Sequence, residues 1–363
     1  MVGAISWEGV EFSIAQLRSF MGRSLAPENP EMEFNGLALA LFAAQWQAVP
    51  IYRALCDRRN IRPGSIEHWR RIPALPTRAF KEYEVSSIPP GDRTRVFHSS
   101  GTGGHKPSRH YHNAESLSVY EASLLPWFKR HFAGGQEARM KFIFLTPENA
   151  PNSSLVHMFT AVRRAFGTPD SAFTGRLNAD GSWGLDVEQT LAAVREAVGE
   201  NTPLGLLGTA FSFVHLLDHL EGAGKRFALP KGSRVLETGG YKGRSREMPK
   251  ARLRLMLSRF LGVPAAHVVG EYGMSELSSQ AYEDAGGVFR FPPWARVLVI
   301  SPETGAEVGE GETGLLRVFD LANIASVLAV QTEDLAARRG EGFELLGRAA
   351  SSEPRGCSLL PGP

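Results

Sequence analysis

Cysteine is scarce in this sequence: the only two among 363 residues are Cys56 and Cys357. Two thiols are too few for the disulfide framework of a small secreted domain or for a zinc site with four thiolate ligands. Low cysteine usage of this kind is typical of proteins that work in a reducing compartment. We therefore expect a cytoplasmic protein.

Long apolar runs and an excess of one charge are missing as well. The most apolar early stretch, Gly36–Ala44, is far shorter than the roughly 20 residues that a membrane-spanning helix requires. The first residues, MVGAISWEGVEF, lack the basic segment and cleavage site of a signal peptide. The 40 Lys and Arg residues nearly balance the 38 Asp and Glu residues, and the net charge is +2. The sequence thus predicts no membrane span and no nucleic-acid partner.

The composition is that of an ordinary folded protein, with 43% hydrophobic and 21% charged residues. The length exceeds the roughly 250–300 residues beyond which chains usually divide into subdomains. We predict a helical N-terminal segment over residues 1–95 and an α/β core over residues 96–290. A small β-rich subdomain is expected over residues 291–350, followed by a tail over residues 351–363 that carries Cys357.

The α/β fold class follows from short apolar segments that alternate with longer segments of helical periodicity. The strands expected in the core are Arg95–His98, Lys141–Thr146, Pro203–Gly208, Arg234–Glu237 and His267–Glu271. The helices expected there are Ala114–Phe132, Ser154–Phe166, Val187–Val198, Phe211–Leu220 and Arg252–Leu261. This alternation predicts a mostly parallel sheet with helices on both faces. Beyond residue 290 we expect a small antiparallel or barrel-like set of strands at Arg296–Ser301, Gly314–Asp320, Ala325–Val330 and Phe343–Leu346.

A loop rich in serine and glycine, SSGTGGHKPS at residues 99–108, stands between an expected strand and an expected helix. Its glycines permit close approach of the backbone, while its hydroxyls and its lysine offer donors and positive charge. These properties suit a loop that holds phosphate oxygens. The spacing differs from that of a Walker A loop and of a dinucleotide fingerprint, and a flexible surface loop is the alternative.

Three later segments also combine residue types that bind nucleotides. Gly239 and Gly240 follow an apolar strand, at the kind of position where open α/β sheets bind ligands. The stretch Tyr272-Gly273-Met274-Ser275-Glu276 offers a ring that can stack on a base, a hydroxyl and a carboxylate. Thr332-Glu333-Asp334 and Gly347-Arg348 add an acid and a base near the end of the β-rich segment. A plain turn is the alternative for the two glycines, and a turn or cap is the alternative for Asp334.

Taken in order, these segments resemble the nucleotide-binding motifs of the adenylate-forming superfamily, which includes acyl-CoA synthetases, luciferases and nonribosomal adenylation domains. Tyr-Gly-Met-Ser-Glu is similar to that family's Tyr-Gly-x-Thr-Glu motif, Thr-Glu-Asp to its Thr-Gly-Asp, and Gly-Arg to the Gly-Arg at its hinge. Over residues 95–357 the chain most resembles the LuxE-type acyl-protein synthetases, which are fatty-acid–protein ligases. The resemblance implies their large-domain architecture, with mixed and parallel sheets flanked by helices and without the mobile C-terminal lysine domain of other members.

The resemblance implies that the Ser/Gly-rich loop holds the β- and γ-phosphates of ATP, with Lys106 supplying positive charge. The loop residues expected to do so are Ser99, Ser100, Gly101, Thr102 and Gly104. Ser275 is expected to contact the α-phosphate, and Glu276 is expected to bind Mg²⁺.

The same resemblance assigns the contacts to the nucleoside. The backbone at Gly239 and Gly240 is expected to run along the edge of the adenine, and Tyr272 is expected to stack on its face. Asp334 is expected to accept hydrogen bonds from the ribose hydroxyls, and Arg348 to reach the ribose or a phosphate.

The acyl acceptor implied by the resemblance is Cys357, the seventh residue from the end of the sequence, which stands in an Arg-Gly-Cys segment. A thiolate attacks an acyl adenylate readily, and a thioester keeps the acyl group activated. The expected catalytic residues are therefore Cys357, Glu276 and Lys106. By contrast, Cys56 lies in a helical stretch beside Leu55 and is expected to be buried.

These observations predict an enzyme that activates a carboxylic acid with ATP and Mg²⁺ and captures the acyl group on Cys357. An acyl reductase or an acyltransferase is the expected partner. One alternative sends the acyl group to coenzyme A or to a carrier protein. Another alternative is a nucleotide-binding subunit without turnover, because the sequence departs from the family pattern at two places. Gly103 replaces a threonine that is usual in the phosphate loop. Ser351 or Ser352 stands where an acidic residue is usual past the hinge.

Overall fold

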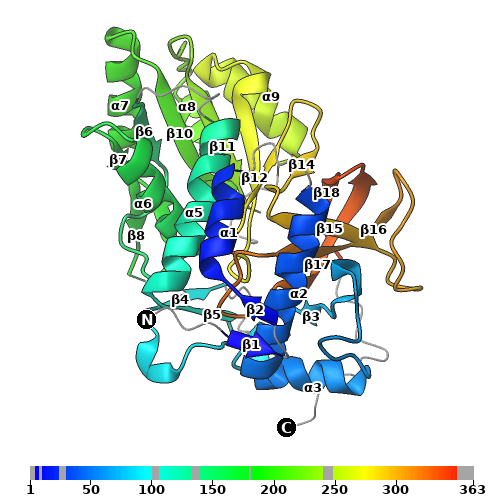
Figure 1. The fold of residues 1–363 in the computed structure, drawn as a ribbon. Coiled ribbons are helices and arrows are strands. Elements are labelled where there is room, and N and C mark those ends of the chain that lie inside the picture. The colour runs from blue at the N-terminus through cyan, green and yellow to red at the C-terminus, as the bar shows by residue number, and fades with distance from the viewer. Residues whose placement is uncertain are drawn as a thin grey trace. The chain divides into compact units, whose positions relative to one another are not determined.

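Parallel strands form the framework of the middle of the chain (Figure 1). The computed structural model describes residues 5–7, 10–23, 30–99, 106–132, 139–179, 181–239 and 248–349. Neighbouring strands follow in the order β12-β11-β10-β6-β7, and every pair whose register is recorded there is parallel. Their bounds are β6 (Lys141–Phe144), β7 (Ala172–Phe173), β10 (Leu204–Thr209), β11 (Arg234–Thr238) and β12 (Val268–Tyr272). The predicted parallel sheet is confirmed.

Helices flank these strands because each strand is apolar on both faces. Ile143 and Leu145 belong to a core with helices α7 (Val187–Gly199), α8 (Ala210–Gly222) and α9 (Lys250–Leu261). Phe142 and Phe144 alternate with them and contact aromatic rings of α5 (Ala114–His131) and α6 (Ser154–Phe166). The alternation of strand side chains thus separates two helical layers by one sheet.

Gly205 in β10 is required by the close approach of an aromatic ring. A Cβ atom at this position would lie 2.5 Å from Cδ1 of Phe142, well inside the normal contact distance. Phe142 lies opposite Gly205 in the parallel register and is itself buried. The glycine therefore makes room on this face of the sheet for the phenylalanine ring.

The later part of the chain forms antiparallel strands, as predicted. They run in the order β15-β16-β17-β18-β14, with bounds β14 (Phe289–Arg290), β15 (Ala295–Ile300), β16 (Thr313–Asp320), β17 (Ala329–Arg339) and β18 (Gly342–Arg348). The prediction of a strand over Ala325–Val330 is wrong in its extent. Residues 325–328 are buried because they pack in the core, whereas the strand itself runs on to Arg339.

The N-terminal residues attach to these antiparallel strands. β3 (Leu75–Pro76) pairs in parallel with β17, and the amide of Thr77 donates to the carbonyl of Gln331. The side chain of Gln45 donates to the carbonyl of Asn323 and accepts from the amide of Leu328. The remaining elements of residues 1–95 are β1 (Ile5–Trp7), β2 (Val10–Phe12), α1 (Ile14–Arg23), α2 (Pro30–Ala48), α3 (Pro50–Arg58), α4 (Ala79–Glu82), the short 3-10 helices η1 (Trp69–Arg71) and η2 (Pro90–Asp92), and the first strand of a hairpin.

That hairpin changes the expected setting of the Ser/Gly-rich loop. β4 (Arg95–His98) pairs antiparallel with β5 (Arg109–His112), and His98 lies opposite Arg109. The predicted strand Arg95–His98 exists, but it belongs to this hairpin rather than to the parallel sheet. The loop therefore connects two strands, not a strand and a helix, because the polar segment 109–112 is itself a strand.

The contacts group the chain into two units that each combine separate stretches of sequence. One unit comprises residues 1–124, 274–281 and 288–363, and the other comprises residues 125–273 and 282–287. The second unit also includes β8 (Gly175–Leu177) and β9 (Trp183–Leu185), while β13 (Ala281–Glu283) crosses from one unit to the other. In the parts of the chain that are described, no helix is long and apolar enough to cross a membrane.

Two glycine substitutions test the packing of the parallel sheet. Gly205→Ala should lower the free energy of unfolding by about 1–3 kcal/mol, because the new methyl group displaces the ring of Phe142. Gly36→Ala is the matched control, because this glycine lies in α2 with open space around it. It should stabilise the protein by about 0.5–1 kcal/mol. Denaturant titration measures both values, and equal effects would contradict the proposed role of Gly205.

Candidate active site

The hairpin β4–β5 meets the Tyr-Gly-Met-Ser-Glu segment through a buried cluster of hydroxyls. The Oγ atoms of Ser108 and Ser275 lie 3.1 Å apart, although 167 positions separate them in sequence. Ser275 donates to the carboxylate of Glu276 at 2.9 Å. All three side chains are buried. Two of the predicted nucleotide-binding segments therefore adjoin one another within one unit.

The base of the Ser/Gly-rich loop is closed by its own residues. The amide of Ser108 donates to Oγ of Ser99 at 2.9 Å, beside the pair of His98 and Arg109 in the hairpin. This bond uses the hydroxyl of Ser99, one of the predicted phosphate-binding residues. Lys106 is exposed at the end of the loop, and its side chain is available to an anion.

His110 holds the backbone of Ser275 in place. Its Nδ1 lies 2.9 Å from the carbonyl oxygen of Ser275, and its Nε2 lies 3.0 Å from Oγ of Ser326. A carbonyl only accepts, so Nδ1 carries the hydrogen and Nε2 accepts from Ser326. Burial lowers the pKa of His110 to about 4, although the hydrogen bond with the Ser275 backbone opposes the shift. The ring is neutral at physiological pH and serves as a fixed support.

Glu276 is a buried carboxyl group in a polar setting. Burial raises its pKa, while hydrogen bonds from Ser108 and Ser275 and the positive charge of Arg348 act against that rise. Buried carboxylates that accept from hydroxyls are oxygen ligands of the kind that Mg²⁺ takes. The residue thus has the chemistry that its predicted role requires.

Asp320 anchors the segment that follows Glu276. Its carboxylate accepts from the amides of Ser278 at 2.9 Å and Ser279 at 2.7 Å, and from the hydroxyl of Ser279 at 2.7 Å. The side chain of Asn323 donates to the carbonyl of Glu276 at 2.9 Å. The backbone of residues 276–279 is therefore bound to the end of β16 and the turn that follows it.

Asp334 and Arg348, the predicted ribose-binding pair, lie on neighbouring strands. They are opposite each other in the register of β17 and β18, and Nε of Arg348 lies 3.2 Å from Oδ1 of Asp334. Asp334 is largely buried, whereas the Arg348 side chain is 71% exposed. The amide of Asp334 donates to Oγ1 of Thr332. The structure thus brings the two late motifs together.

Gly239 and Tyr272, the predicted adenine-binding residues, belong to the other unit. Gly239 follows β11 with a φ of +72°, a conformation that favours glycine. Tyr272 is the last residue of β12 and is buried, and Gly273 follows it in an exposed position. These residues stand at the carboxyl ends of adjacent parallel strands, where ligands of open α/β sheets bind.

The ends of the same two strands carry buried glutamates that the sequence analysis did not single out. Thr238 donates to the carboxylate of Glu271, which lies opposite it in the register. Burial raises the pKa of Glu271 to about 7, the hydrogen bond from Thr238 lowers it, and the charge of Glu237 raises it. Nζ of Lys250 lies 2.5 Å from Glu283 and 3.8 Å from Glu237.

Several predicted residues lie outside the described part of the chain. They are Ser100, Gly101, Thr102, Gly104, Gly240 and Cys357. Their roles stay predictions. The other cysteine, Cys56, is buried in α3, and burial raises the pKa of its thiol to about 12. The expectation that Cys56 packs in the interior is confirmed, and this thiol is unsuited to nucleophilic chemistry.

The family model of the LuxE acyl-protein synthetases matches residues 21–360 of the chain. The chain belongs to this family. The predicted relationship to the LuxE type is thereby confirmed, as is the predicted class of enzyme, an acid–thiol ligase that works through an acyl adenylate. A long-chain-fatty-acid–luciferin-component ligase of Aliivibrio fischeri is 23% identical to this LuxE-family chain, over 85% of the chain and 82% of the relative.

Solved structures share the fold of this LuxE-family protein. An open conformation of 2-hydroxyisobutyryl-CoA ligase, in complex with 2-HIB-AMP and CoA, matches 88% of the chain and 77% of its own length with a TM-score of 0.63. The sequence identity is 13%. ATP-bound MatB from Rhodopseudomonas palustris matches 72% of the chain and 49% of its own length, with a TM-score of 0.50 and 15% identity. The predicted adenylate-forming architecture is confirmed.

Sequence reasoning missed most of the residues that support the site in this LuxE-family chain. His110 and Ser326 occur in no motif, and the only sign of His110 was its place on a short alternating segment, RHYH. Ser108 stood at the edge of the loop, but its hydroxyl was not distinguished from its neighbours. Asp320 was expected only as the end of a strand.

His110 variants test the support of Ser275. His110→Leu leaves the Ser275 carbonyl and the Ser326 hydroxyl unpaired in the interior and should lower the free energy of unfolding by about 2–4 kcal/mol. His110→Asn retains a donor near the Nδ1 position, so its free energy of unfolding should fall by roughly half as much as that of His110→Leu. Denaturant titration provides the comparison, with the exposed His219→Asn as control. Equal losses for the Leu and Asn variants would show that the hydrogen bond is unimportant.

Glu271→Gln tests the buried carboxyl group through its pH dependence. Between pH 4.5 and about 7 the unfolded state releases this proton while the folded state retains it, so wild-type stability falls as pH rises. Glutamine does not titrate, and Thr238 can still donate to it. The variant should match wild type near pH 4.5 and exceed it by about 3 kcal/mol above pH 7. Thermal unfolding at both pH values, with the exposed Glu221→Gln as control, measures the difference; a constant offset would refute the assignment.

Proposed function

We propose that this LuxE-family chain activates a fatty acid with ATP and transfers the acyl group to its own Cys357. The observation that carries the proposal is the buried contact of Ser108 with Ser275 and Glu276, which joins the base of the Ser/Gly-rich loop to the Tyr-Gly-Met-Ser-Glu segment. The choice of a fatty acid is supported by the activity named for the Aliivibrio fischeri relative.

The first step forms the acyl adenylate. A carboxylate oxygen of the acid attacks the α-phosphorus of ATP, and the bond from that phosphorus to the oxygen of the β-phosphate breaks. Pyrophosphate leaves with the bonding electrons, and no proton moves. In this proposal the Ser275 hydroxyl contacts an α-phosphate oxygen, and Ser99 and Lys106 contact the β- and γ-phosphates.

Mg²⁺ fits the oxygen donors of this site. Within the described residues, no group of three or more His, Cys, Asp or Glu side chains is arranged to hold a metal ion. Glu276 would be a protein ligand, and phosphate oxygens and water would complete the coordination, which is usual for Mg²⁺ on nucleotides. The ion would neutralise charge on the phosphates.

The second step makes a thioester. The thiolate of Cys357 attacks the carbonyl carbon of the acyl adenylate, the bond from that carbon to the phosphate oxygen breaks, and AMP leaves. The thiol proton is lost to solvent before attack. A thioester keeps the acyl group activated, so it can pass to a second enzyme. We infer an acyl reductase or acyltransferase as that partner, in the cytoplasm.

Pyrophosphate exchange separates the two steps. Wild type should exchange labelled pyrophosphate into ATP only when a suitable acid is present, and intact mass spectrometry should detect an acyl adduct that hydroxylamine removes. Cys357→Ser should retain the exchange and lose the hydroxylamine-sensitive adduct, because adenylation needs no thiol. Cys56→Ser is the matched control and should retain both properties.

Other outcomes point to the other functions. An adduct that persists in Cys357→Ser would exclude this residue as the acceptor. Product that forms only after addition of coenzyme A or a carrier protein would identify an external thiol. Binding of ATP without exchange for any acid in a broad panel would identify a subunit without turnover.

A further inference from the structure

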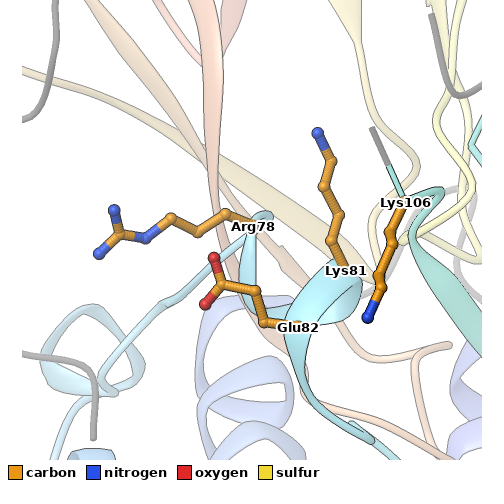
Figure 2. A pocket seen from close by; sticks show the side chains of 4 residues that line it. All are labelled: Arg78, Lys81, Glu82 and Lys106. Carbon is orange, nitrogen blue, oxygen red and sulfur yellow. The ribbon is translucent and has the colours of Figure 1, made fainter. Parts of the chain in front are cut away.

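A cavity beside α4 gathers three basic side chains that no motif predicted as a group. It has a volume of about 290 Å³ and is lined by Arg78, Lys81, Glu82 and Lys106. Figure 2 shows the first three projecting from the α4 segment and Lys106 from the end of the Ser/Gly-rich loop. Three cations and one carboxylate give the cavity an excess of positive charge.

In the described part of the chain, the three cations that line the cavity form no ion pairs with carboxylates of the protein. Within the described residues, none of Arg78, Lys81 and Lys106 takes part in a salt bridge, whereas Arg93 and Arg70 in the same unit each pair with a glutamate. Arg78 and Lys81 are half-buried and Lys106 is exposed. Three cations near one carboxylate, Glu82, leave positive charge in excess, so an anion that binds all three would be favoured.

The α4 segment is fixed relative to the Ser108–Ser275 cluster. The amide of Thr77, beside Arg78, donates to the carbonyl of Gln331 in β17. Phe80, between Arg78 and Lys81, is buried with its ring 6.0 Å from the ring of His110. His110 in turn contacts the Ser275 carbonyl. Arg78 and Lys81 therefore emerge from a backbone that is packed against the support of Ser275.

The size of the cavity limits which ligands fit. A volume of about 290 Å³ lies at the lower limit of small-molecule sites, so it suits a compact charged group rather than a whole nucleotide. Lys81 and Lys106 point in different directions in Figure 2, and their flexible stems allow them to turn toward a common anion. A diphosphate has several oxygens that can accept from the guanidinium and both ammonium groups at once.

We propose that Arg78 and Lys81, together with Lys106, bind the β- and γ-phosphates of ATP and hold the pyrophosphate that adenylation releases. The proposal rests on the proposed function and extends it to two residues outside the recognised motifs. When the bond between the α-phosphorus and the bridging oxygen breaks, the electron pair and the negative charge pass to pyrophosphate. Cations that already contact the β- and γ-phosphates stabilise the negative charge of the leaving pyrophosphate more than they stabilise the charge of bound ATP.

The experiment compares Arg78→Gln, Lys81→Gln and their double variant with wild type. Calorimetry with Mg²⁺ measures the affinity for inorganic pyrophosphate, ATP, AMP and coenzyme A, and pyrophosphate exchange measures turnover. Each single variant should bind pyrophosphate and ATP about tenfold more weakly, and the double variant more weakly still. Affinity for AMP should change less than twofold, because AMP lacks the β- and γ-phosphates. Arg78→Lys should recover part of the loss.

Arg71→Gln is the matched control, because Arg71 is an exposed cation in the same unit away from the cavity lining. It should leave all affinities and the exchange rate unchanged. If the double variant equals this control while wild type exchanges pyrophosphate, the cation proposal fails and the proposed function stands. If the variants lost affinity only for coenzyme A, the cavity would bind the diphosphate of that molecule instead, and the proposal would be overturned. Absence of both pyrophosphate binding and acid-dependent exchange in wild type would overturn the two together.

Discussion

The buried carboxylate of Asp320 is the constraint on which the candidate site depends. It accepts from three backbone amides, those of Ser278, Ser279 and Ala322, and from one hydroxyl. Water cannot replace these partners in the interior, so a displaced segment 276–279 would leave amides and a carboxylate unpaired. Glu276 is the first residue of this segment. Its position is therefore fixed by Asp320, the last residue of β16, which lies 44 positions later in the sequence.

The hairpin β4–β5, which comes earlier in the sequence, holds Ser275, the residue directly before this segment. His110 supports the Ser275 carbonyl, and Ser108 contacts the Ser275 hydroxyl. Because His110 is neutral, it provides this support without adding charge beside Ser108 and Ser275. Buried hydrogen bonds of this kind resist distortion, so the backbone at Ser275 is held in one position.

Apolar strands were predictable because their signals are local. β6, β10, β11 and β12 are short runs of apolar residues between helical segments, and the predicted helix Ser154–Phe166 matches α6 at both ends. The strand β5 carries no such signal, because buried histidines replace apolar residues on its inward face. The contacts of Asp320 with Ser278 and of His110 with Ser275 depend on residues far away in sequence. No property of the neighbouring residues could reveal them.

The discontinuous make-up of the first unit has a consequence for protein synthesis. A ribosome releases residues 125–273 before it reaches residues 288–349, so the second unit can fold while the first is still incomplete. Asp320 emerges 42 positions after Ser278, and until then the segment that carries Glu276 lacks its anchor. Nascent chains that stall before β16 would hold a folded parallel sheet, while residues 276–279 would still lack their partner Asp320.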